Sequence, residues 1–211
     1  MSWFKQAQNT VISPSQKSVT DSPEFMAWFS GSKAVDSTGR PMVFYHGTKN
    51  AFDTFEVGTR GSNSNFLGSW DVQRAAIFFT PDPNLAAGFA SQGEETGFVG
   101  ENIKPVYLAV FDPIDLRNGF TFAELNTMED LGLNPRYYNN VQHMWEIFDY
   151  ENGGQELVSV LKKMGHDGAI MSEEGSDTWA VFDPIQIKSV GNKGRFDKDS
   201  PNILASRAIS A

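Results

Sequence analysis

The order of β-prone and helical segments constrains the fold of this chain more than any other feature. Short β-prone runs stand on both sides of the helical segments, at residues 42–46, 76–80, 104–111, 168–172, 178–183 and 185–190. Strands that bracket helices without regular alternation are typical of antiparallel sheets, not of a doubly wound parallel sheet. The sequence therefore predicts an α+β fold built on antiparallel sheets.

Capping signals and apolar periodicity predict the helices. The segment Asp21-Ser22-Pro23-Glu24 supplies an N-cap, an early proline and a carboxylate for the first helix, and Thr121 with Glu124 forms a capping box for another. Three more helices are expected after residues 80–83 and over residues 134–150 and 155–164.

Composition limits the number of domains and the chemistry. A length of 211 residues with 40% hydrophobic residues fits one domain, which we expect over residues 21–211. Residues 1–20 are rich in Ser, Gln, Thr and Asn and are interpreted as a mobile or partner-docked arm. The absence of cysteine excludes disulfides, thiol nucleophiles and cysteine-bound zinc.

Charge and hydropathy indicate the surroundings of the protein. No apolar stretch reaches the length of a signal peptide core or a membrane span, so we expect a soluble, cytoplasmic protein without a membrane partner. A net charge of −9 disfavours nonspecific binding to nucleic acid. The three histidines have no metal-ligand spacing, and the common phosphate-loop, dinucleotide, zinc-protease and nucleophile-elbow motifs are missing.

The segment Tyr45-His46-Gly47-Thr48 closes the first β-prone run. A glycine at the end of a strand lets backbone N–H and C=O groups approach a ligand closely. A histidine at such a position is also commonly a structural residue. Residues 58–70 are small and polar with isolated aromatics, which is typical of a long ordered loop that covers a site.

Four short motifs occur in the order found in a known enzyme family. They are Tyr45-His46-Gly47-Thr48, residues 77–80, residues 86–90 and residues 179–189. In these motifs the chain resembles ADP-ribosyltransferases of the diphtheria-toxin and poly(ADP-ribose)-polymerase branch, and most closely the small domains of phage and plasmid polyvalent proteins. The resemblance covers about residues 22–204 and implies split antiparallel sheets, arranged as a β-sandwich with flanking helices, that bind NAD⁺ in a cleft.

The resemblance also implies roles for the motif residues. His46 would bond a ribose hydroxyl of NAD⁺, and Gly47, within Tyr45-His46-Gly47-Thr48, would clamp the nicotinamide amide through its backbone. Phe78 and Phe89 fall on two tyrosines of the family, keeping an aromatic face for nicotinamide but losing the hydroxyl. Ordinary core packing is the alternative for both rings. Arg60 or Lys188 would face the pyrophosphate.

Thr178 stands where polymerase-like members of the family carry an acid, so chain elongation is not expected. Cleavage of the nicotinamide bond still needs an acceptor for the neighbouring ribose hydroxyl, because positive charge develops on the sugar. We expect a hairpin whose turn is residues 174–177, which places Glu173 opposite Thr178, about 5 Å away. Glu173 is then the candidate carboxylate, with Glu174 and Asp177 as reserves. A solvated acidic turn is the alternative.

The function implied is that of a mono-ADP-ribosyltransferase that cleaves NAD⁺ and modifies a macromolecular acceptor, either protein or nucleic acid. By analogy with the family, we expect a toxin with an antitoxin or partner protein, or a factor in conflict between phage and bacterium. Three alternatives stay open: an NAD⁺ glycohydrolase, a catalytically silent module that binds NAD⁺ or ADP-ribose, and an unrelated α+β domain with coincidental motifs.

Overall fold

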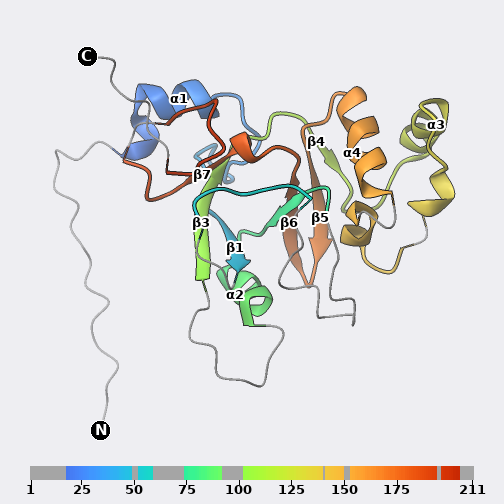
Figure 1. Ribbon diagram of the computed structural model, residues 1–211, viewed down its shortest axis with the longest axis horizontal. Helices are drawn as coiled ribbons and strands as arrows, with labels where there is room; N and C mark the ends of the chain where they lie inside the picture. Colours follow the sequence, from blue (N-terminus) through green and yellow to red (C-terminus); the bar gives the residue numbers. More distant parts are fainter. Residues whose placement is uncertain are drawn as a thin grey trace, which may run out of the picture.

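The computed structural model describes residues 18–48, 52–58, 74–91, 102–139, 141–149, 153–193 and 196–204. Within these ranges the chain forms an α+β fold with two sheets and four α-helices (Figure 1). This agrees with the fold class predicted from the sequence. No helix in the described ranges is long and apolar enough to cross a membrane.

The first sheet has three antiparallel strands in the order β1-β3-β7: Phe44–Thr48, Asn102–Leu108 and Ile187–Ser189. The second sheet has the order β2-β6-β5-β4: Ile77–Phe79, Ser176–Val181, Gly168–Glu173 and Pro113–Asp115. Its pairs are antiparallel except for β4 and β5, which run parallel and depart from the prediction. A bridge between Tyr45 and Thr80 joins the two sheets.

The α-helices are α1 (Pro23–Phe29), α2 (Pro83–Ser91), α3 (Phe122–Asp130) and α4 (Gly154–Lys163). The Ser22 hydroxyl caps α1, and the predicted capping box of Thr121 and Glu124 begins α3. In Figure 1, α1 lies above the first sheet and α2 below β1, while α3 and α4 lie beyond the second sheet.

The helix predicted over residues 134–150 is wrong. The described part of this segment holds only two 3-10 turns, η3 (Pro135–Tyr137) and η4 (Met144–Phe148), and His143 before η4 is extended with φ −126°. Asn134 bonds the backbone of the first turn, as asparagine does in caps and turns. Ile147 and Phe148 are fully buried. Their tertiary contacts hold the segment as a short 3-10 turn instead of a regular helix.

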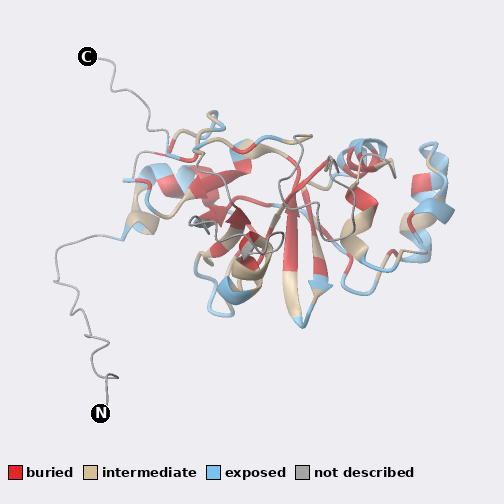
Figure 2. Ribbon diagram, turned by 60° about the horizontal axis from the view of Figure 1, so that its bottom comes forward, coloured by how far each residue is buried: buried red, intermediate tan, exposed pale blue. Residues whose placement is uncertain are grey.

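Two hydrophobic clusters cover opposite faces of the second sheet. Side chains alternate between the faces of a strand, so Phe79 and Trp179 face the aromatic cluster that includes Phe25 of α1. Ala180 faces the other cluster, together with Leu157 of α4. Figure 2 shows the middle strands as red, buried stretches. Phe78 consequently points away from the aromatic cluster that holds its neighbours.

The hairpin of β5 and β6 turns over two residues, not four as expected. Glu173 lies opposite Ser176, and Thr178 lies opposite Met171. The turn residues Glu174 and Gly175 have φ values of 49° and 81°. Positive φ at both central residues matches the twist of the flanking strands, which is why a tight turn forms here.

The ends of the predicted strands and of the arm also differ in detail. The strand expected at 42–46 runs from Phe44 to Thr48 and so includes Gly47. Of the arm proposed for residues 1–20, residues 1–17 lie outside the described ranges, and Val19 begins the 3-10 turn η1 (Val19–Asp21), where it packs on the core.

Candidate active site

The β1 strand presents the backbone of Gly47 away from β3. The N–H of Tyr45 donates to Thr80 at 2.8 Å, and its C=O accepts from Thr80 at 3.1 Å. Tyr45 lies opposite Pro105, which has no N–H, so this pair of β1 and β3 is not hydrogen-bonded. Backbone direction alternates along a strand, so the N–H and C=O of Gly47 point to the same side as those of Tyr45. Neither group has a backbone partner there among the described residues.

The α2 helix packs directly against Gly47. A Cβ at this position would lie 1.9 Å from the carbonyl oxygen of Ala86 and 3.0 Å from the nitrogen of Ala90. The sequence predicted that this glycine lets a ligand approach, and the structure shows that the packing of α2 already requires a glycine here. Phe89 of the same helix is half-buried, one turn beyond Ala86.

His46 connects the two sheets through its side chain. Its Nδ1 lies 2.9 Å from the carbonyl oxygen of Phe78, which can only accept, so Nδ1 carries the hydrogen. Phe55 and Phe79 pack against the ring with centroids 5.0 and 5.4 Å away. Burial lowers the pKa of His46 to about 4, and the charge of Lys104 acts in the same direction, against the bond to Phe78. Neutral His46 therefore keeps a lone pair on Nε2 that can accept a hydrogen bond.

Phe78 is half-buried on the face of the second sheet opposite Phe79. Its ring meets Phe148 edge-on, with centroids 5.9 Å apart. The guanidinium of Arg74 lies over the same ring, 5.2 Å from its centroid. Phe78 therefore makes core contacts on one side and carries a cation on its face, rather than being enclosed by apolar neighbours alone.

Glu173 and Thr178 lie on the same face as Phe78. Their positions follow from the register, because Phe78 pairs with Ala180 and Thr178 pairs with Met171. The buried hydroxyl of Thr178 donates to Oε2 of Glu173 at 3.0 Å. The hairpin register was predicted wrongly, yet the two side chains meet diagonally across the strands.

Neighbouring groups shift the pKa of Glu173 in both directions. Burial raises the pKa of the Glu173 carboxyl, and the nearby charge of Glu174 raises it further. The hydrogen bond from Thr178 and the charges of Arg74 and His143 lower the pKa. Glu173 is thus a half-buried carboxyl close to cationic groups, a combination often found in functional sites.

Arg74 is the residue of this site that the sequence analysis missed. Its Nε lies 3.2 Å from Oδ1 of Asp149, and its guanidinium also lies 4.6 Å from the ring of Trp145. Desolvation lowers the pKa of Arg74, while Asp149 and Glu173 raise it. In the sequence Arg74 is an isolated basic residue ahead of β2, and its partners come from segments about 70 to 100 residues away.

The remaining predicted residues are distributed as follows. Tyr45 is held by its bridge to Thr80, and Thr48 is buried at the end of β1. Arg60 lies outside the described residues, as does the loop expected to act as a lid, apart from Gly58. Lys188 is fully buried and donates to the carbonyl of Ser200, with Asp197 and Asp199 nearby, so its proposed position at a pyrophosphate is wrong.

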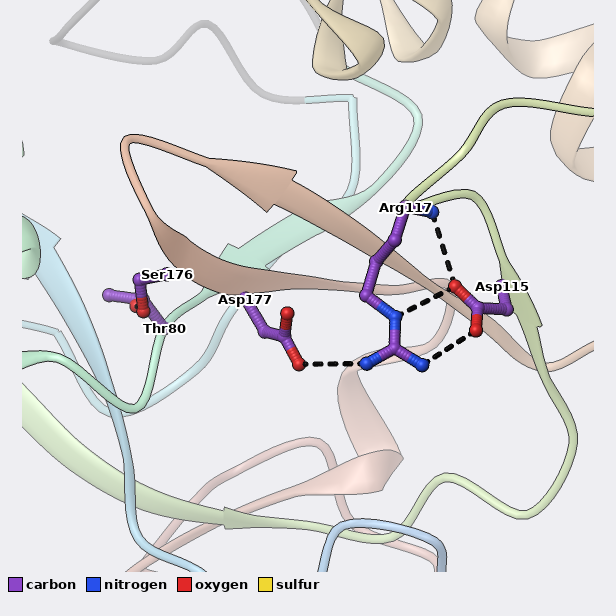
Figure 3. Close-up of polar contacts among 5 residues, drawn as sticks. All are labelled: Thr80, Asp115, Arg117, Ser176 and Asp177. Carbon is purple, nitrogen blue, oxygen red and sulfur yellow. Dashed lines mark hydrogen bonds and ion pairs between the residues drawn. The ribbon is translucent and has the colours of Figure 1, made fainter.

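The reserve carboxylate Asp177 points to the other face of the hairpin. Figure 3 shows it beside Arg117, at 3.4 Å, which in turn is paired with Asp115 at 2.6 Å. Thr80 and Ser176 lie at the other side of the same view, with their hydroxyl oxygens 3.3 Å apart. Asp177 is therefore held in a surface ion pair, whereas Ser176 shares the face of Glu173.

These positions place four of the predicted site residues, His46, Phe78, Thr178 and Glu173, on β1, β2 and the hairpin of β5 and β6. His46 is bonded to Phe78, while Thr178 and Glu173 share the face of Phe78 near the tip of the hairpin. In Figure 1 this tip and α2 lie at the same lower side. No group of three metal-ligating side chains occurs within the part of the chain that the structure describes.

Two split sheets that meet at a histidine-bearing strand agree with the fold of an ADP-ribosyltransferase domain. The family model of ADP-ribosyltransferases in polyvalent proteins matches residues 36–196, and the chain belongs to this family. Such domains use NAD⁺ as a substrate and have an acceptor for ADP-ribose. The hypothesis of coincidental motifs is therefore wrong. No curated protein and no solved structure matches the chain.

Proposed function

We propose that this chain cleaves the nicotinamide–ribose bond of NAD⁺ and transfers single ADP-ribose units to a macromolecular acceptor, with Glu173 as the catalytic carboxylate. The observation that carries the proposal is the hydrogen bond of 3.0 Å from Thr178 to Glu173. It holds a carboxylate of β5 beside the position on β6 where the family draws its acid. The reaction thus keeps its carboxylate although residue 178 has none.

Gly47 supplies the recognition of nicotinamide. The carboxamide of nicotinamide has both a donor and an acceptor, and the N–H and C=O of Gly47 face away from β3 as a matching pair. Phe89 on α2 offers an aromatic ring on the helix that covers Gly47. A flat cationic ring is stabilised by such a face without a phenol hydroxyl.

His46 supplies an acceptor for a ribose hydroxyl. Its Nδ1–H is committed to the carbonyl of Phe78, and its lowered pKa keeps Nε2 unprotonated at neutral pH. A hydroxyl of the substrate can therefore donate to Nε2. The same bond ties this acceptor to Phe78, which lies beside the Glu173 face of the second sheet.

Glu173 stabilises the charge that develops during cleavage. The bond between ribose C1 and the nicotinamide nitrogen breaks, and its electron pair leaves with nicotinamide. The sugar becomes positively charged, so a hydrogen bond from its 2-hydroxyl to a carboxylate strengthens as the transition state forms. Partial burial of Glu173 makes this interaction stronger than it would be in water.

Transfer of a single unit is favoured over chain elongation. Elongation needs a carboxylate to activate a hydroxyl of the growing chain. Polymerase-like members carry this acid at the position of residue 178, which is a buried threonine in this chain. Glu173 reaches the site from the neighbouring strand and is bonded to Thr178. We therefore expect one ADP-ribose per acceptor site. We expect the reaction in the cytoplasm of a bacterium or phage-infected cell, and a conflict or toxin role fits the family by analogy.

A second candidate function is a silent module that binds NAD⁺ or ADP-ribose. It is favoured by Phe78 and Thr178, because both lack the polar group that family members have at these positions. Hydrolysis, with water as the acceptor, is the remaining variant of the enzyme proposal. The three are separated by their products rather than by binding.

The test is release of nicotinamide from NAD⁺ labelled in its adenylate part, measured with and without cell lysate. We expect nicotinamide release and transfer of label to macromolecules, and we expect Glu173→Gln to lower kcat more than it changes KM. Glu129→Gln, an exposed carboxylate on α3, is the control and should keep the rate of the parent. A rise in Tm with NAD⁺ but no nicotinamide release would support the silent module.

A further inference from the structure

An exposed aromatic stack lies next to the proposed site and has no role in the function described so far. His143 stacks on Trp145 with centroids 5.7 Å apart and ring planes 9° from parallel. His143 is exposed at the start of η4, and Trp145 is half-buried under the guanidinium of Arg74. We call His143 and Trp145 the aromatic shelf.

The η4 turn, which carries Trp145 of the aromatic shelf, contacts β5, the strand of Glu173. Arg74 lies over both Trp145 and Phe78, so planar groups lead from the shelf to a ring on the same face of the second sheet as Glu173. The charge of Arg74 acts on Glu173 and favours its ionised form. A group placed on the shelf is therefore close to the carboxylate that the proposed function requires.

The shelf selects a planar occupant, and the charge around it selects a cation. Glu173 and the exposed Glu174 stand at the hairpin tip, and the guanidinium of Arg74 over Trp145 is already paired with Asp149. Nucleobases are planar but bring phosphates, which the carboxylates at the tip repel. Lysine is cationic but not planar, whereas the guanidinium of arginine is planar, cationic and stacks on aromatic faces.

We infer that the acceptor is an arginine side chain, whose guanidinium stacks on His143 and is directed to the ribose by Glu173. This inference rests on the proposed function and names its acceptor. A guanidinium nitrogen forms a bond to ribose C1 as the bond from C1 to nicotinamide breaks. The electron pair of the broken bond leaves with nicotinamide, and the proton lost by the nitrogen passes to the Glu173 carboxylate and then to water.

The experiment uses agmatine, a small guanidine, as the probe acceptor for the full chain with NAD⁺. We expect nicotinamide release to rise with agmatine concentration and mass spectrometry to find an ADP-ribosyl-agmatine adduct. Cadaverine, a primary amine of similar length, should give no adduct. His143→Ala should lower the adduct yield about fivefold, the size of a stacking contribution at an exposed site, and His143→Phe should restore it.

Phe122→Ala is the matched control, because Phe122 is another exposed aromatic, 79% exposed on α3, and its removal should leave the yield unchanged. Nicotinamide release with label on single-stranded oligonucleotides and none on agmatine would overturn the arginine acceptor and leave the proposed function standing. An agmatine adduct that His143→Ala does not reduce would overturn the shelf as its site. Absence of nicotinamide release under every condition would overturn the proposed function, and the acceptor with it.

Discussion

The Nδ1–H of His46 donates to the carbonyl oxygen of Phe78 at 2.9 Å, across the junction of the two sheets. This bond holds the ring of His46 and links β1 to β2. It also fixes the tautomer, so Nε2 is left as an acceptor. Because the folded protein holds His46 in its neutral form, its stability should depend on pH.

We expect the protein to lose stability as the pH falls from about 6.5 to about 4. Burial lowers the pKa of His46 from 6.5 to about 4, so the unfolded chain binds a proton in this range that the folded chain does not. The stabilisation is complete above pH 6.5 and disappears as the pH falls through 4. Urea unfolding at several pH values measures it. His46→Gln, which can still donate to Phe78, should remove this part of the pH dependence.

The contribution of Lys104 to this effect is tested separately. Lys104 lies directly opposite His46 on β3, and its charge lowers the pKa of His46. Lys104→Gln should therefore raise that pKa toward 6.5, so the loss of stability at low pH becomes smaller and ends at a higher pH. An unchanged pH profile in Lys104→Gln would mean that burial alone keeps His46 neutral.

Two glycines close together in the fold should respond oppositely to alanine. Gly47→Ala places a Cβ 1.9 Å from the carbonyl oxygen of Ala86, so β1 and α2 must separate. Backbone shifts of this size cost about 3 kcal/mol or more. Gly88→Ala on α2 meets no described atom within 4 Å and should stabilise the helix by about 0.5–1 kcal/mol. Thermal unfolding of both variants is the measurement, and equal effects would contradict the packing of α2 on Gly47.

The sequence predicted the parts of the fold whose signals are local. The proline and cap residues before α1 and the capping box of α3 act within one turn, and those helices form as expected. The segment 134–150 shows why other parts could not be predicted. Its buried residues, among them Ile147 and Phe148, are held by contacts from distant segments, and these override helical periodicity.

The candidate site shows the same limit. His46, Gly47 and Phe78 lie in motifs that can be read along the chain, whereas Arg74 gains its role only from Asp149, Trp145 and Glu173 in the fold. The hairpin register depended on Glu174 adopting a positive φ, which is uncommon outside glycine. A two-residue turn could be predicted from the sequence only by placing Glu174 at a positive φ, which is unfavourable for this residue type.

Removing Arg74 should change the pH dependence of turnover. The charge of Arg74 lowers the pKa of Glu173, so Arg74→Gln raises that pKa and leaves the carboxyl protonated up to higher pH. The acidic limb of nicotinamide release should therefore shift to higher pH, with a larger loss at pH 6 than at pH 8. Arg74→Lys keeps the charge and should restore the limb, although it loses the planar contact with Trp145. If both variants lose the same fraction of nicotinamide release at every pH, Arg74 acts only through its packing contacts.

Exchanging the two bonded side chains of the hairpin tests whether the carboxylate can act from either strand. Glu173→Thr alone should lose most of the nicotinamide release, because no carboxylate then remains at this contact. Adding Thr178→Glu returns a carboxylate to β6 with a hydroxyl partner on β5, and we expect it to recover at least about tenfold in kcat, equivalent to about 1.4 kcal/mol of transition-state stabilisation. Thr178→Glu in the parent instead places two carboxyls side by side, so it should raise the pKa of one of them and shift the acidic limb of the rate upward. If the double variant is as inactive as Glu173→Thr while unfolding like the parent, the reaction does not depend on a carboxylate at this pair.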